Sequence, residues 1–186
     1  LDGDQLTERE IVRQCDLLLV AGNVTTTDLL SNALKALADF PTERDKLVAN
    51  LDLLPAAVEE TLRYDSPVTN SGRIAHEDIE IDGVAIAQGE SLSVSLAAAN
   101  RDPDIYPDPD RFDIEREDRH TAAFGGGRHF CLGAHLAKLE AEEALRAFLA
   151  RYPRFEISEK GFTRAAVPSF RGFEDLWIEP GGARER

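Results

Sequence analysis

The residues best suited to chemistry lie in the segment 124–133, FGGGRHFCLG, where Cys131 follows a run of glycines. A stretch with helical periodicity, 132–151, begins directly after this cysteine. The free amides and the dipole of a helix N-terminus stabilise a thiolate. Glycine also lets the backbone come close to a flat ligand or to the sulfur. Cys131 is therefore a candidate nucleophile or metal ligand, and a buried, inert cysteine is the alternative.

Zinc is a second interpretation of this segment. His129, Cys131 and His135 lie close in sequence, and residues 131 and 135 share a helical face. However, a structural zinc site needs a fourth ligand, and none is evident. A zinc site also does not explain why the glycine run and Phe124 are present.

Two other segments break ordinary helix rules. In residues 21–27, AGNVTTT, a glycine and a β-branched run weaken a helix by roughly 3 kcal/mol relative to alanine. Weak helix sequence inside an apolar stretch is typical of a functional site, although close helix packing also uses glycine. Glu60 and Arg63 are spaced to pair on one helical face. Such a pair is ordinary on a surface, but apolar neighbours here predict partial burial.

These segments need helices to position them. Thr7 and Glu10 form a capping-box pattern, which predicts a helix over 8–38 that spans roughly 46 Å at the standard helical rise. Its middle, 17–21, is apolar on every side and predicts burial all round. The remaining expected elements are helices at 42–50, 55–64 and 132–151 (the last with two buried faces), hairpins within 68–95, an irregular loop at 100–121, and strands at 154–157 and 175–178. The predicted fold class is mainly α with small β-sheets.

Composition excludes several classes of function. The 186 residues carry 35 acidic and 21 basic side chains, a net charge of -14, which argues against a nucleic-acid partner. No apolar run approaches the ~20 residues needed to cross a bilayer, and no signal peptide is visible, so we expect no membrane association and a cytoplasmic location. Two cysteines fit a reducing compartment. Because the chain lacks methionine and starts at Leu1, we expect it to be part of a larger domain.

Taken together, these segments resemble the cytochrome P450 family of haem-thiolate monooxygenases, in its soluble bacterial form. Residues 124–133 match the family pattern F-x-x-G-x-[RH]-x-C-x-G, and Glu60 with Arg63 matches its ExxR motif. Residues 109–112, PDRF, are similar to its PERF-type segment. The stretch 100–103, NRDP, is familiar from the bacterial branch, and 21–26 resembles the oxygen-binding groove of the central helix. The resemblance covers 1–186 as the carboxy-terminal, haem-binding portion of one larger domain whose amino-terminal portion is absent.

The resemblance implies haem b (iron protoporphyrin IX) as the cofactor, with Cys131 as the ligand of its iron. The other residues that it implies at the cofactor are Phe124, Gly125, Gly127, His129, Arg73, Gly133, Ala21 and Gly22. Of these, His129 and Arg73 would pair with the haem propionates. Glu60, Arg63 and Arg111 would form a structural ion-pair cluster.

Thr25, Thr26 and Asn23 are the implied catalytic residues on the oxygen side. The family usually carries Asp or Glu directly before this threonine, and Val24 stands there instead. The departure means that the family's usual acid is missing from the proton relay. The alternatives that could replace this acid are Asn23, Thr26, a water chain and a hydroxyl of the substrate. The substrate side would comprise Val68, Thr69, Asn70, Ser169 and Phe170.

The activity implied is insertion of one oxygen atom from dioxygen into a small organic substrate, by hydroxylation or epoxidation, in secondary metabolism. A ferredoxin or flavodoxin would supply electrons by docking on a basic patch of Arg119, Arg128, Lys138 and Arg146. Three alternatives stay open: a haem-thiolate binding or sensor protein, a peroxide-driven or atypical oxidation, and a scaffold fragment that binds no haem.

Overall fold

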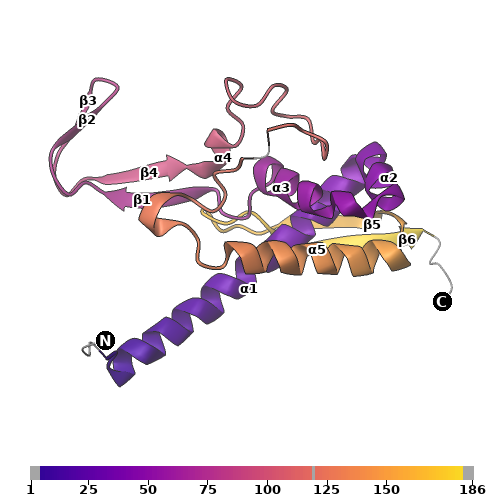
Figure 1. Ribbon diagram of the computed structural model, residues 1–186, viewed down its shortest axis with the longest axis horizontal. Coiled ribbons are helices and arrows are strands. Elements are labelled where there is room, and N and C mark those ends of the chain that lie inside the picture. The colour runs from indigo at the N-terminus through magenta and orange to yellow at the C-terminus, as the bar shows by residue number, and fades with distance from the viewer. Residues whose placement is uncertain (1–4, 119, 182–186) are drawn as a thin grey trace.

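The computed structural model describes residues 5–118 and 120–181. Its helices are α1 (Glu8–Asp39), α2 (Pro41–Ala49), α3 (Leu54–Tyr64), α4 (Leu96–Ala99) and α5 (Ala134–Arg151), with short 3-10 helices η1 (Leu51–Leu53) and η2 (Gly127–His129). Three antiparallel pairs of strands complete the fold: β1 (Asn70–Ile74) with β4 (Ser91–Ser95), β2 (Ile79–Ile81) with β3 (Val84–Ile86), and β5 (Arg154–Arg164) with β6 (Phe173–Gly181). The predicted class, mainly α with small β-sheets, is confirmed (Figure 1).

Helix α1 begins at the predicted capping box. The Thr7 hydroxyl accepts a hydrogen bond from the Glu10 amide at 3.3 Å, and the Glu10 carboxylate accepts one from the Thr7 amide at 2.8 Å. The helix then runs unbroken through the weak segment 21–27. Inside that segment, the Thr25 hydroxyl donates to the Ala21 carbonyl at 2.8 Å, one turn earlier. Hydroxyl back-bonding of this kind satisfies the side chain without ending the helix.

The core forms around the carboxy-terminal half of α1, which packs against α2, α3, α5 and the β5–β6 pair (Figure 1). One face of α1 is buried there because its apolar residues recur at helical spacing. The largest fully buried apolar side chains of the core are Leu29, Leu37, Leu47, Leu54, Val58, Phe112, Ile114, Leu145, Leu149 and Phe155. This core holds α1 and α5 in fixed relation, and the candidate site lies between them.

The amino-terminal half of α1 extends away from this core (Figure 1). Leu19 and Val20 are 73% and 68% exposed, so the prediction of burial all round is wrong for the described residues. The helix is longer than the part of the chain that packs on it. Helix α5 likewise buries one face instead of the predicted two, because Leu136 and Leu139 stay exposed while Ala141 and Leu145 are covered. None of the described helices combines the length and apolarity needed to cross a membrane.

The hairpins follow the predicted turn residues. Asp82 and Gly83 adopt left-handed φ angles of 51° and 79° between β2 and β3, where glycine is favoured at the second position. The terminal strands are longer than predicted, and β5 contains register irregularities between Ile157 and Phe162. A single bridge joins Val68 to Phe170 and brings the loop before β6 beside β1.

Candidate functional site

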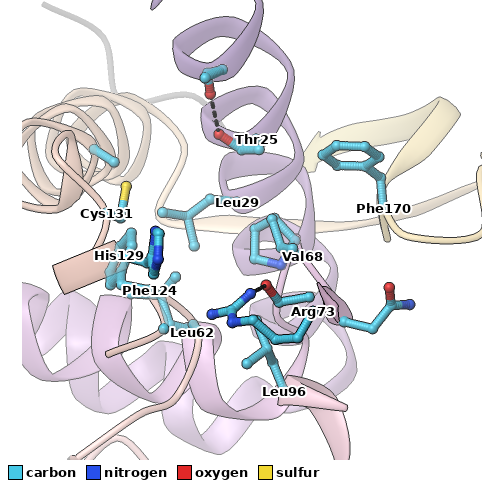
Figure 2. Close-up of a pocket in the computed structure, with 17 residues that line it drawn as sticks. Thr25, Leu29, Leu62, Val68, Arg73, Leu96, Phe124, His129, Cys131 and Phe170 are labelled. Atoms are coloured by element: carbon cyan, nitrogen blue, oxygen red, sulfur yellow. Dashed lines mark hydrogen bonds between the residues drawn. The ribbon is translucent and has the colours of Figure 1, made fainter. Parts of the chain in front are cut away.

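A cavity of about 480 Å³ opens between α1, the end of α3, β1 and the cysteine segment (Figure 2). Helix α1 contributes Ala21, Thr25 and Leu29, which lie one turn apart on one face. The predicted site residues that line this cavity are Ala21, Thr25, Val68, Asn70, Arg73, Phe124, Gly125, His129, Cys131 and Phe170. Residues from both ends of the described chain therefore meet at one place.

A second cavity of about 340 Å³ adjoins the first along α1 and α5. The two cavities share Ala21, Thr25, Phe124, Cys131 and Ala137. The second also reaches the predicted residues Gly22, Asn23, Thr26 and Gly133. Cys131 and Thr25 border both spaces, so a flat ligand seated at the sulfur would have α1 on its other face.

The cysteine segment is a tight loop closed by its own backbone. The Cys131 amide donates to the Phe124 carbonyl at 3.0 Å. Gly125 and Gly127 have φ angles of 68° and 62°, in the left-handed region that favours glycine. The thiol of Cys131 is exposed at the mouth of this loop, three residues before α5 begins. The loop therefore presents a sulfur beside the first amides of a long helix.

The lining matches the requirements of a haem better than those of a bare metal ion. One thiol, apolar walls and two basic side chains, Arg73 and His129, suit a flat ring with an iron centre and carboxylate substituents. Arg73 already donates to the Ser71 hydroxyl at 2.6 Å and to the Gly72 carbonyl at 2.7 Å, which orients its guanidinium in the cavity. No three His, Cys, Asp or Glu side chains of residues 5–118 and 120–181 form a group that could hold a metal ion. The zinc interpretation is therefore wrong for the described residues.

Some predicted residues lie behind the cavity wall. Ser169 donates its hydroxyl to the Asn70 side chain at 3.2 Å, and the Thr69 hydroxyl donates to the Pro168 carbonyl at 3.4 Å. Both residues tie the loop before β6 to β1, and neither lines the cavity. Gly127 supports the loop from outside both cavities. Conversely, sequence reasoning missed several lining residues: Leu29, Leu62, Pro67, Leu96, Ala123 and Ala137. Leu29 had a usable signal, since it continues the Ala21 and Thr25 face by one turn.

The ion-pair cluster forms as predicted around Glu60 and Arg63, with one correction. The Arg63 guanidinium binds both carboxylate oxygens of Glu60, at 2.7 and 2.9 Å, and the two residues are 2% and 4% exposed. The predicted third member, Arg111, directs an exposed side chain to Asp113, 3.3 Å away, and offers only its carbonyl to Arg63. Arg116 fills that position instead, with Nε 3.4 Å from Glu60. The loop turns between the two arginines, and only the second faces inward.

The predicted basic patch is partly neutralised. Lys138 forms an ion pair with Glu59, and Arg146 lies 3.5 Å from Glu143. Arg128 lies within the cysteine segment and is exposed. Arg119, the fourth predicted member, lies outside the described residues. Pairing leaves a mixed surface on this side of the molecule rather than a purely cationic one.

Asp28 is a buried acid that sequence reasoning did not single out. It lies on α1, is 8% exposed, and packs against Gly172, where an added Cβ would lie 1.8 Å from its Oδ1 atom. Glu43, Glu60 and Asp65 are also buried and each forms an ion pair, whereas Asp28 forms none within the described residues. Burial raises the pKa of the Asp28 carboxyl, and the positive charge of Arg164 offsets this only in part.

The raised pKa of Asp28 predicts a pH-dependent difference in stability. A carboxyl with a higher pKa in the folded state than in the unfolded state stabilises the folded protein fully at pH values below the unfolded-state pKa. This stabilisation is lost as pH rises through the folded-state pKa. Asp28→Asn stays neutral, so its thermal midpoint should exceed that of the wild type at neutral pH and approach it in acid. Asp39→Asn, an exposed change on the same helix, is the control. A midpoint difference that is constant across pH would contradict the prediction.

Comparison with known proteins decides the family. The family model "Cytochrome P450" matches residues 1–164. This chain belongs to the cytochrome P450 family. Cytochromes P450 carry a haem, so membership implies a haem cofactor and accords with the thiol, apolar walls and basic side chains of the cavity.

Curated relatives of cytochrome P450 type match almost the whole chain. The "Biotin biosynthesis cytochrome P450" of Bacillus subtilis is 44% identical over 173 residues, which cover 93% of this chain and 44% of the relative. The "Putative cytochrome P450 140" of Mycobacterium tuberculosis is 46% identical over 182 residues, covering 97% of this chain and 41% of the relative. The chain thus spans slightly less than half the length of these relatives.

Solved cytochrome P450 structures share the fold. CYP109E1 from Bacillus megaterium, in complex with testosterone, superposes with a TM-score of 0.94 at 38% identity, covering 98% of this chain and 51% of that one. P450BioI, bound to an acyl carrier protein ligated to hexadec-9Z-enoic acid, gives a TM-score of 0.92 at 44% identity, covering 97% and 47%. The small sheets and long helix described above are those of a cytochrome P450.

Proposed function

We propose that this chain is the carboxy-terminal, haem-binding half of a monooxygenase that inserts one oxygen atom from dioxygen into a small organic substrate. The observation that carries the proposal is the exposed Cys131 thiol facing the Thr25 side of α1 across a cavity with apolar walls. Family membership supports the same chemistry. The cofactor is haem b, and the location is cytoplasmic.

Each lining residue has a defined task in this proposal. Cys131 is the ligand of the iron, and the amides at the start of α5 stabilise its negative charge. Arg73 and His129 would bind the propionates of a haem, and Phe124 would pack against the ring near Cys131. When bound, the haem supplies iron chemistry that activates dioxygen, and an anionic sulfur favours cleavage of the O–O bond. Gly125 keeps the loop close to the ring.

The α1 side of the cavity handles oxygen and substrate. The Thr25 hydroxyl orders water and passes protons, with Thr26 and Asn23 beside it. Val68, Asn70 and Phe170 form the wall of the cavity on the substrate side, and Thr69 and Ser169 hold this wall in place. Hydroxylation or epoxidation of a secondary metabolite is the reaction class.

Electrons come from a ferredoxin or flavodoxin that docks on the cysteine side of the molecule. Arg128, within the cysteine segment, is an exposed cation there, and Lys138 and Arg146 extend the surface. Complementary charge would speed this encounter and make it sensitive to salt. A peroxide-driven oxidation, which needs no donor, is the second candidate, because Val24 replaces the usual acid before Thr25.

The decisive experiment follows the oxygen atoms. Full-length protein, a ferredoxin with its reductase, and heavy-isotope-labelled dioxygen should give a product that carries one labelled oxygen atom and water that carries the other. Product labelled only from heavy peroxide would support the second candidate. Failure to bind haem or to consume dioxygen would overturn both.

Removing the Thr25 hydroxyl tests its task. Thr25→Ala should leave the fold intact, because the hydroxyl bonds only to the Ala21 carbonyl within the described residues. Peroxide released per reductant oxidised should rise several-fold, since dioxygen that has taken up two electrons and two protons would leave as hydrogen peroxide before its O–O bond is cleaved. Thr27→Ala, which loses an equivalent bond to the Asn23 carbonyl at 3.0 Å, is the matched control. Equal peroxide release from Thr25→Ala and the wild type would show that protons arrive by another group.

A further inference from the structure

The β5–β6 loop, residues 165–172, carries part of the cavity wall. Phe170, near the end of this loop, lines the main cavity together with Val68. Figure 2 shows Phe170 and Cys131 at opposite sides of the view, with helix α1 between them. The Phe170 ring therefore limits the space that the cavity offers on the side away from the sulfur.

Main-chain hydrogen bonds hold this loop beside the segment that leads into β1. The Arg171 amide donates to the Pro67 carbonyl at 2.8 Å, and the Thr69 amide donates to the Ser169 carbonyl at 3.1 Å. The isolated bridge described above lies between these two bonds. The bonds fix the two stretches to each other, but none of them reaches α1 or β5.

Asp65 and Asn32 connect this wall to α1 and β5. The Asp65 carboxylate is buried, and it accepts a hydrogen bond on Oδ1 from Arg171 Nε and one on Oδ2 from Arg164 of β5, the latter at 2.7 Å. The Asn32 side chain of α1, fully buried, donates to the carbonyls of Asp65 and Arg171 at 2.8 and 2.7 Å. It accepts from Arg164 at 2.9 Å. Both amide hydrogens of Asn32 and both carboxylate oxygens of Asp65 are therefore used.

Such a network fixes a position more narrowly than apolar packing does. Hydrogen bonds to a charged group are directional, whereas hydrophobic attraction is not. A buried carboxylate that loses its cations is also costly, so Asp65 keeps both arginines close. Phe170 itself is 37% exposed, so its own packing holds it only in part.

We propose that Asp65 is a positioning residue for the substrate: through Arg171 it sets how far the Phe170 ring enters the cavity. The inference rests on the proposed monooxygenase function and adds a rule of selectivity to it. Because the wall at Val68 and Phe170 is apolar, the substrates selected are elongated apolar molecules, discriminated by their length. Asp65 lines neither described cavity, so it acts through the wall and does not touch the substrate.

The test titrates the full-length haem protein with imidazole and with 1-alkylimidazoles from methyl to dodecyl, and follows binding to the iron by absorption. The wild type should prefer one range of chain lengths, and Phe170→Ala should flatten that preference. Asp65→Ala and Arg171→Ala should do the same, weakening the best alkylimidazole about tenfold, which corresponds to roughly two fewer buried methylene groups. Imidazole, which carries no chain, should bind as in the wild type. Arg171→Lys should keep the preference, because an ammonium still pairs with Asp65.

A double-mutant cycle separates positioning from a general structural effect. If Asp65 acts through Phe170, adding Asp65→Ala or Arg171→Ala to Phe170→Ala should change the affinities no further. Should Asp65→Ala fail to fold, Arg171→Ala carries the same test, because its side chain is 53% exposed. Arg151→Ala, an exposed change at the end of α5, is the control and should match the wild type.

Three results would overturn the inference. They are additive losses in the cycle, an unchanged chain-length preference in Arg171→Ala, and a preference that is absent from the wild type or survives in Phe170→Ala. A wild type that binds no haem, or that consumes no dioxygen with a ferredoxin and its reductase, would instead overturn the proposed function. The two failures are therefore distinguishable.

Discussion

Cys131→Ser is expected to remove thiolate-type spectra from the full-length protein. Cys131 is the one cysteine that lines the described cavities, because Cys15 lies on the exposed part of α1. A serine oxygen lacks the anionic sulfur on which thiolate-type spectra depend. The low-spin, thiolate-type electron paramagnetic resonance signal should vanish, and haem retention should fall at least as far as the roughly 10- to 100-fold seen for outer-shell changes at metal sites.

The matched control for this change is Cys15→Ser. It makes the same chemical change at an exposed position on α1 and should keep both the signal and the haem. Retention of thiolate-type spectra by Cys131→Ser would refute the ligand assignment. Loss of those spectra in Cys15→Ser instead would identify Cys15 as the ligand, although Cys15 lines neither of the described cavities.

Arg63→Ala is expected to cost about 3–5 kcal/mol of the free energy of unfolding. The Arg63 guanidinium makes five hydrogen bonds: two to Glu60, and one each to the carbonyls of Asn100, Pro109 and Arg111, at 3.0, 2.8 and 3.0 Å. Its removal leaves Glu60 buried with only the more distant Arg116 as cation, and three carbonyls lose a donor. Denaturant unfolding of the full-length protein measures the loss.

Two further variants separate burial from charge. Arg146→Ala removes an exposed ion pair with Glu143 and should change stability by less than about 1 kcal/mol. Arg63→Lys keeps the charge but has three donors on a point-like ammonium, so it should recover only part of the loss. Equal effects of Arg63→Ala and Arg146→Ala would contradict a structural role for the buried cluster.

Local signals in the sequence predicted the helices well. The capping box at Thr7 marks the start of α1 through bonds within a few residues, and Pro41 and Pro55 lie in the first turns of α2 and α3. The turn at Asp82 and Gly83 is equally local. Such features depend on nearby backbone geometry, so they can be predicted without knowing the tertiary packing.

Features that depend on distant partners were harder to predict. A motif placed Arg111 near Glu60, but only the path of the loop decides that the Arg116 side chain turns inward. The apolar side chains of Leu19 and Val20 predict burial, but no described residue packs over them and both are exposed. Asp28 looks like an ordinary helix residue until Gly172, far along the sequence, closes over it.

The most direct test of the central claim is the absorption spectrum of the reduced carbon monoxide complex of the full-length protein. A sulfur anion from Cys131 on the iron predicts the strongly red-shifted Soret band that only thiolate ligation produces. A band at the shorter wavelength typical of histidine ligation, or the absence of any haem spectrum, would contradict the account.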